Sequence, residues 1–166
     1  MKELFWRAVA NVVTWGPIRT WIIKRAMKTP YFHLTGYMNR YWFFNPTERE
    51  SKRRRWNWIP VSMRVHHILS ADADDSEHNH PWDARTIILD NWYVEQRNDS
   101  KPRISCRVPG YTGLIGAKQF HRILEVAPGG VWTLFIMYKF QGEWGFKVKG
   151  KFVPYKEYEN KRKEHS

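Results

Sequence analysis

Cysteine is almost absent from this chain, and so are long apolar runs. Cys106 is the only cysteine among 166 residues. No disulfide can therefore form within the chain, and no CxxC pair is available for zinc binding or redox chemistry. No uninterrupted apolar run reaches the roughly 18 to 20 residues that a transmembrane helix needs, and no secretory signal with a small-residue cleavage site is evident. These absences predict a protein without a transmembrane segment in a reducing, cytoplasmic setting.

Acidic residues are scarce in comparison with basic ones. The 16 Asp and Glu residues face 28 Lys and Arg residues, which gives a net charge of +12. Much of the excess lies in two basic runs that have aromatic neighbours, Lys52-Arg53-Arg54-Arg55 and Lys161-Arg162-Lys163. Such runs can bind nucleic acid or an anionic surface, or they can form a solvated loop and a frayed tail. Because no recognition motif accompanies them, we expect only weak, non-specific nucleic-acid binding.

The N-terminal segment has a helical pattern that is interrupted once. Apolar residues recur from Leu4 to Trp15, a Gly16-Pro17 break follows, and a second apolar stretch runs from Ile18 to Ile23. These helices either pack on protein (their own domain or a partner subunit) or lie on a membrane surface as amphipathic helices. We expect packing on protein, with these residues buried: Phe5, Val9, Val12, Trp15, Trp21 and Ile22.

The pattern changes to short β-like segments from about residue 31. Segments rich in aromatic and β-branched residues alternate with Gly, Pro and Asn turn signals, which is typical of an all-β sandwich or barrel. They span residues 31–34, 41–44, 61–69, 85–95, 103–108, 112–115, 120–126, 131–138 and 143–148. We therefore expect a helical extension over residues 1–30, a β-barrel domain over residues 31–158 and a basic tail over residues 159–166.

His78-Asn79-His80-Pro81-Trp82 is the most informative motif in the chain. Residues i and i+2 of a strand point to the same face, so His78 and His80 can be directed at one metal ion. His121 lies about forty residues further on in another strand-like segment, where a β-barrel could bring it to the same point. The alternative is a pair of solvent-facing histidines in a turn that Pro81 makes.

These histidines fit the frames of the two cupin motifs, although the frames are incomplete. His78 and His80 match the first motif, and Gly110 and His121 match the second. The position of the motif's glutamate falls on Ala84 or Arg85, and neither supplies a carboxylate. Four further residues differ from those that the two motifs require: Asp72, Gly116, Lys118 and Glu125. Asn91 lies near the position of the glycine that closes the first motif.

The chain resembles the small cupin-like proteins that are common in tailed-phage genomes. The resemblance covers roughly residues 31–158 and is carried by residues 60–69, 78–82, 86–95, 120–123, 130–136 and 144–146. It implies a cupin-like jelly-roll β-barrel with an N-terminal helical extension, a metal centre, pairing of barrels into a homodimer and, for a phage protein, a host-cytoplasmic location. It implies no particular reaction, because cupins include dioxygenases, isomerases, regulators and storage proteins.

The missing glutamate favours a metal centre of three neutral imidazoles. Strand parity places Ala84 on the same face as His78 and His80, whereas Asp83 would point away. The predicted ligands are thus His78, His80 and His121, and the predicted cofactor is one divalent transition metal: iron, manganese, nickel or zinc. Such a site suits a small anionic ligand and oxygenase-type or isomerase-type chemistry. The alternative is a non-catalytic scaffold or ligand sensor whose basic surface binds nucleic acid or a host protein.

Further residues are candidates for roles around this centre. Tyr93 and Glu95 share one face of a strand and are our candidate catalytic residues, with Glu95 either a general base or a partner of a ligand imidazole. Only one residue of the pair His66-His67 can face the interior, as a fourth ligand, a proton shuttle or a hydrogen-bonded core residue. Three arginines could hold a carboxylate or phosphate, or could be ordinary surface residues: Arg64, Arg85 and Arg122.

Overall fold

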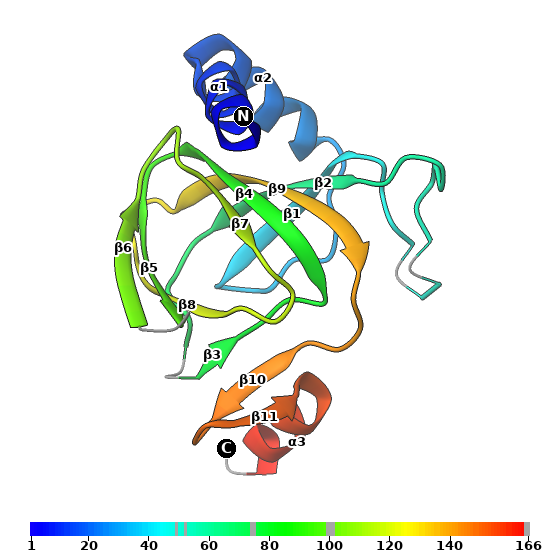
Figure 1. The fold of residues 1–166 in the computed structure, drawn as a ribbon, viewed down its shortest axis with the longest axis vertical. Helices are drawn as coiled ribbons and strands as arrows, with labels where there is room; N and C mark the ends of the chain where they lie inside the picture. Colours follow the sequence, from blue (N-terminus) through cyan, green and yellow to red (C-terminus); the bar gives the residue numbers. More distant parts are fainter. Residues whose placement is uncertain (49, 52, 74–75, 99–101, 165–166) are drawn as a thin grey trace.

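Two antiparallel β-sheets face each other and enclose the interior of the molecule (Figure 1). The computed structural model describes residues 1–48, 50–51, 53–73, 76–98 and 102–164. The five-stranded sheet has the order β1 (Met38–Phe44), β2 (Ser62–Ile68), β9 (Val131–Phe140), β4 (Trp82–Asp90) and β7 (Thr112–Ile115). The six-stranded sheet has the order β11 (Lys151–Pro154), β10 (Gly145–Val148), β3 (Glu77–His78), β8 (Phe120–Val126), β5 (Tyr93–Asn98) and β6 (Pro102–Arg107). The prediction of an all-β domain is therefore confirmed.

Successive side chains of the central strands point alternately into the space between the sheets and to the outer face of the five-stranded sheet. Arg64 and His66 of β2 point into the space between the sheets, whereas Val65 points to the outer face of the five-stranded sheet. Both faces are covered, so consecutive residues of β2 and β4 are buried. Asn91 makes the tight connection from β4 to β5 with a φ of 63°, a left-handed conformation that asparagine tolerates better than most residues.

Two helices, α1 (Lys2–Thr14) and α2 (Gly16–Met27), cover the outer face of the five-stranded sheet (Figure 1). Ala10 and Ala26 are fully buried there, and Ile22 packs on the sheet with them. The helices thus pack on their own barrel, as expected, but the prediction of which side chains are buried was partly wrong. Four of the six residues are exposed: Phe5, Val12, Trp15 and Trp21. The helices meet the sheet with a different face, which contains Ala10, Ile22 and Ala26. No helix in the described part of the chain has the length and apolar character needed to cross a bilayer.

The C-terminal segment contains two elements that the sequence did not predict. Strand β11 pairs with β10, and helix α3 (Tyr155–Glu164) follows it directly. The rings of Tyr155 and Tyr158 stack on Trp144 and Phe146, which fixes α3 against β10. Most of the expected basic tail is therefore helical. The strand expected at residues 31–34 is absent, and within that range only Leu34 forms an isolated bridge, with Met38.

Candidate metal centre

Three histidines from separate parts of the chain converge between the sheets. His78 ends β3, His80 lies in the short link to β4, and His121 belongs to β8. The register of the six-stranded sheet pairs His78 directly with His121. Their potential ligand atoms and that of His80 all lie within 4.8 Å of one another. The sheet register therefore assembles the cluster that the spacing in the sequence indicated.

Two of the three imidazoles have the separation expected for ligands of a single metal ion. The Nε2 atoms of His80 and His121 are 2.8 Å apart. Two imidazole nitrogens that bind one ion at about 2.0–2.1 Å are expected roughly 3 Å from each other. Burial lowers the pKa of His80 well below 6.5, and the nearby His121, His78, His66 and Arg97 lower it further. His80 is thus neutral at physiological pH, and a neutral imidazole is the form that binds a metal.

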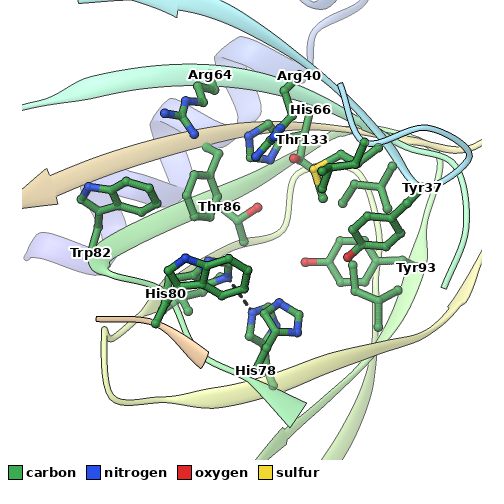
Figure 2. A pocket seen from close by; sticks show the side chains of 18 of the residues that line it. Tyr37, Arg40, Arg64, His66, His78, His80, Trp82, Thr86, Tyr93 and Thr133 are labelled. Carbon is green, nitrogen blue, oxygen red and sulfur yellow. Dashed lines mark hydrogen bonds between the residues drawn. The ribbon is translucent and has the colours of Figure 1, made fainter. Parts of the chain in front are cut away.

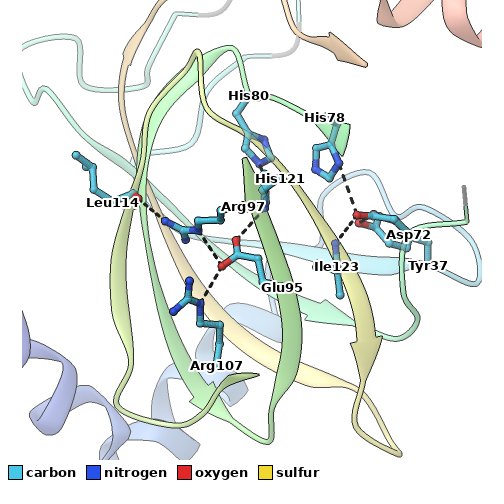
Figure 3. A network of polar contacts seen from close by, with 10 residues as sticks. All are labelled: Tyr37, Asp72, His78, His80, Glu95, Arg97, Arg107, Leu114, His121 and Ile123. Carbon is cyan, nitrogen blue, oxygen red and sulfur yellow. Dashed lines mark hydrogen bonds and ion pairs between the residues drawn. The ribbon is translucent and has the colours of Figure 1, made fainter. Parts of the chain in front are cut away.

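Carboxylates lie behind two of the three histidines (Figure 3). Glu95 Oε1 is 2.9 Å from His121 Nδ1, and Asp72 Oδ2 is 3.6 Å from His78 Nδ1. A carboxylate at Nδ1 fixes the ring orientation and leaves Nε2 available for a metal, which is the usual arrangement around metal-binding histidines. Asp72 is itself held by the amide N–H of Ile123 and by the hydroxyl of Tyr37, which both donate to it.

Glu95 is the centre of a buried ionic network. Its carboxylate is fully buried and accepts hydrogen bonds from Arg97 Nε and Arg107 Nε at 2.8 and 2.9 Å. Burial alone would raise the pKa of Glu95, but the bonds and charges of His121 and Arg97 outweigh it and lower the pKa to about 2. Arg97 also donates to the carbonyl oxygen of Leu114 in the opposite sheet. Glu95 is therefore ionised and firmly held, which favours a role as partner of His121 over one as general base.

The histidine cluster forms one wall of an internal cavity of about 220 Å³ (Figure 2). Tyr93 contributes to this cavity, and its pKa is raised well above 10 by burial and by the charge of Glu95. No acidic residue is among the described residues that line it: Leu34, Tyr37, Met38, Arg40, Arg64, His66, Ile68, His78, His80, Pro81, Trp82, Thr86, Tyr93, Ile115, His121, Ile123, Thr133, Phe135 and Trp144. The cavity therefore presents cations, imidazoles and rings, which is a setting for an anion.

The structure places the remaining candidate residues outside the histidine cluster. His66 faces the cavity and stacks on Phe135, whereas His67 stacks on Trp132 on the outer face. Only one residue of the His66-His67 pair faces the interior, as expected, and it is not part of the cluster of potential ligands found among the described residues. Asp83 points away from the cavity, as predicted, because its carboxylate accepts hydrogen bonds from the Ala117 amide and the Gln141 side chain.

The three candidate arginines have different positions. Arg85 lies on the outer face, where it forms an ion pair with Glu3 of α1 at 2.7 Å. Arg122 does not line the cavity, because its neighbour His121 takes the inward position on β8. Arg64 does line the cavity. The sequence did not predict a role at the site for Asp72, Tyr37 or Arg97. Their contacts join segments that are distant in the chain, and no sequence motif links those segments.

Comparison with known proteins identifies the fold. No protein-family model and no curated protein matches the sequence. Among solved structures, a cupin 2 conserved barrel domain protein from Rhodopseudomonas palustris is 12% identical with a TM-score of 0.51, over 81% of this chain and 82% of that one. An oxalate decarboxylase variant from Bacillus subtilis is 10% identical with a TM-score of 0.52, over 70% of this chain and 29% of that one. The hydroxypropylphosphonic acid epoxidase from S. wedmorenis is 13% identical with a TM-score of 0.50, over 69% of this chain and 56% of the epoxidase.

These similarities establish the jelly-roll architecture. The chain spans just over half of the epoxidase chain, and about four fifths of it matches about four fifths of the small cupin barrel protein. Identities of 10–13% carry information about the fold and not about the reaction. The chain has the cupin fold, as the HxH motif and the frame around His121 predicted.

Proposed function

We propose that this cupin-fold protein is a metal-dependent enzyme that acts on a small anionic molecule at His78, His80 and His121. The observation that carries the proposal is the convergence of three imidazoles on one wall of a cavity whose described lining residues include no carboxylate. Imidazole ligands suit iron, nickel or zinc, and manganese is the fourth candidate metal. Oxygenase-type chemistry is our first choice within this class, and isomerase-type chemistry is the second.

The absence of a carboxylate ligand supports the choice of an anionic substrate. Three neutral imidazoles leave a divalent ion with its full charge, and such an ion supplies Lewis acidity and open coordination positions. Arg40 and Arg64 add positive charge to the same cavity. Two of the structural neighbours are named for small acids, hydroxypropylphosphonic acid and oxalate, which is consistent with this substrate class.

Tyr93 and Glu95 have separate roles in this proposal. The raised pKa keeps the Tyr93 hydroxyl protonated, so its role in the cavity is to donate a hydrogen bond to a bound molecule, and proton transfer from it would require a strongly basic acceptor. Glu95 is a positioning residue that holds the Nδ1 side of His121. Its negative charge also strengthens His121 as a ligand.

The alternative is a non-catalytic barrel that binds a ligand without turning it over. In that case the basic surface would be the functional feature, as a contact for nucleic acid or a host protein. Arg53 and Arg55 are exposed in the loop between β1 and β2, whereas Lys52 lies outside the described residues. A barrel that holds no metal tightly would favour this alternative.

Elemental analysis of the purified full-length protein tests the proposal. We expect close to one divalent transition metal per chain and a sharp loss in each of His78→Ala, His80→Ala and His121→Ala, because two imidazoles leave an incomplete shell. His33→Ala is the matched control, since His33 is exposed and lies outside the cluster. Unchanged metal content in all three cluster variants would place the metal elsewhere and end this proposal.

A further inference from the structure

Arg64 is a buried cation in the cavity, and none of its contacts among the described residues is with an acidic group. We propose that its guanidinium binds an oxyanion, a carboxylate or phosphate group of the ligand, away from the histidine cluster. The ligand is then a small molecule with two polar ends, one at the histidines and one at Arg64. The contact of the ligand with the histidines rests on the proposed function, whereas the anion site at Arg64 does not depend on that function.

A comparison with the other buried arginines shows what is unusual about Arg64. Arg64, Arg85 and Arg97 are 6%, 3% and 6% exposed. Arg85 is paired with Glu3 at 2.7 Å and Arg97 with Glu95 at 2.8 Å. Each of the three has one buried guanidinium nitrogen without a hydrogen-bond partner among the described residues, but Arg64 alone of the three has no ion pair there either. Because burying an unpaired charge is costly, a missing counter-ion at this position indicates a place for an anionic ligand.

Aromatic rings surround Arg64 without satisfying its hydrogen bonds. Its guanidinium carbon lies 4.5, 4.3 and 5.5 Å from the ring centroids of Tyr31, Trp42 and Trp82. Ring faces attract a cation, but they do not replace the acceptors that a planar fork of N–H groups requires. Burial lowers the pKa of Arg64 to about 10, and the nearby Arg40 contributes to this shift. Arg64 therefore remains charged at neutral pH and offers the bidentate geometry that carboxylates and phosphates match.

Arg64 lies on the opposite sheet from two of the cluster histidines. Arg64 and His66 belong to β2 of the five-stranded sheet, whereas His78 and His121 belong to the six-stranded sheet. Figure 2 shows Arg64 beside His66 on one side of the cavity and His78 on the other. A ligand that contacts both Arg64 and the histidines must therefore cross the space between the sheets.

The residues between these two ends limit the ligand further. The centroid of the Phe135 ring lies 5.1 Å from that of His66 and 5.5 Å from that of His80, so an apolar ring lies between the neighbour of Arg64 on β2 and the histidine cluster. The buried Nε2 of His66 also has no hydrogen-bond partner among the described residues, and it adds a second polar atom near Arg64. The cavity of about 220 Å³ is smaller than the roughly 300–1,000 Å³ of drug-sized ligand sites. These features favour a compact molecule with a short apolar link between its two polar ends.

The test uses full-length protein, with acetate and inorganic phosphate as the probes. Titrations followed by the backbone amide signals of β2 and β9 report binding near Arg64. We expect saturable binding to the wild type of at least one probe and about tenfold or greater weakening in Arg64→Gln, because charge-assisted bonds are lost. Arg122→Gln is the matched control, since Arg122 does not line the cavity. Arg64→Lys should bind with intermediate strength, because it keeps the charge but not the fork.

A second variant separates this inference from the proposed function. His121→Ala should lose metal but keep the anion site, so probe binding should persist in it. Binding that is lost in His121→Ala and kept in Arg64→Gln would overturn the Arg64 site while supporting the metal centre. Absence of saturable binding to the wild type would also overturn it. If Arg64→Gln does not fold, Arg64→Lys decides: weaker binding supports the site, and unchanged binding overturns it.

Discussion

At the scale of single residues, the candidate metal centre depends on Glu95 as well as on the histidines. Glu95 binds His121 at 2.9 Å while it neutralises Arg97 and Arg107 (Figure 3). One carboxylate thus orients a potential ligand and compensates two buried or nearly buried cations. A change at this position should therefore affect both metal affinity and stability, and these two effects can be separated by the choice of substitution.

We expect Glu95→Asp to weaken metal binding about 10- to 100-fold, because the shorter side chain keeps the charge near the arginines but withdraws from His121. Glu95→Gln should also destabilise the fold, by roughly 3–5 kcal/mol, since it leaves buried Arg97 without a counter-ion. Metal affinity is measured by competition with a chelator, and stability by denaturant unfolding. Glu125→Gln, an exposed residue of β8, is the control. Wild-type affinity in Glu95→Asp would mean that Glu95 does not position His121.

At the scale of elements, α1 and α2 close the outer face of the five-stranded sheet. Ala10 and Ala26 are fully buried against it, so the helices approach the strands closely at these two points. Arg19 and Arg85 add ion pairs across the same interface, with Asp90 and Glu3. Close packing of this kind tolerates little added volume.

Ala10→Leu should lower the free energy of unfolding by about 1–3 kcal/mol, because the larger side chain cannot fit between helix and sheet without displacement. Ala8→Leu is a matched control on the same helix, since Ala8 is exposed and should be nearly neutral there. Thermal and denaturant unfolding of the two variants give the comparison. Equal stability of both variants would show that α1 does not pack closely on the barrel.

Some elements of the structure could be predicted from the sequence and others could not. Local patterns predicted β7, β8 and the break between α1 and α2, and the motif spacing predicted the histidine cluster. Helix α3 is held by the stacking of only Tyr155 and Tyr158 on β10, and two rings in a mostly polar segment are too few to form a recognisable apolar stripe. Residues 31–34 have strand-favouring side chains, but strand formation depends on a pairing partner that only the tertiary structure supplies. Asp72 escaped prediction because an irregular loop brings it to His78.

At the scale of the whole molecule, the excess of positive charge lies in two places, the internal cavity and the surface. The net charge is +12, and the described residues that line the internal cavity include arginines and histidines but no acidic residue. On the surface, the loop between β1 and β2 carries Arg53, Arg54 and Arg55. Arg54 donates hydrogen bonds to Ser62 and to the Tyr138 carbonyl oxygen, so its side chain is tied to the barrel. Pairing of barrels into a homodimer remains a prediction.

The exposed charges of this loop should bind nucleic acid weakly and without sequence preference. Contacts to phosphates release counterions, so affinity should fall by orders of magnitude between low and physiological salt. The double variant Arg53→Ser/Arg55→Ser should reduce binding and the steepness of its salt dependence, while metal content stays unchanged because the loop does not contribute to the histidine cluster. Filter binding over a range of salt concentrations measures both quantities, and His121→Ala serves as the converse control, with metal lost and nucleic-acid binding kept. Tight, sequence-selective binding at physiological salt would contradict this prediction, because discrimination between sequences requires side chains placed against base edges, and would favour the non-catalytic alternative.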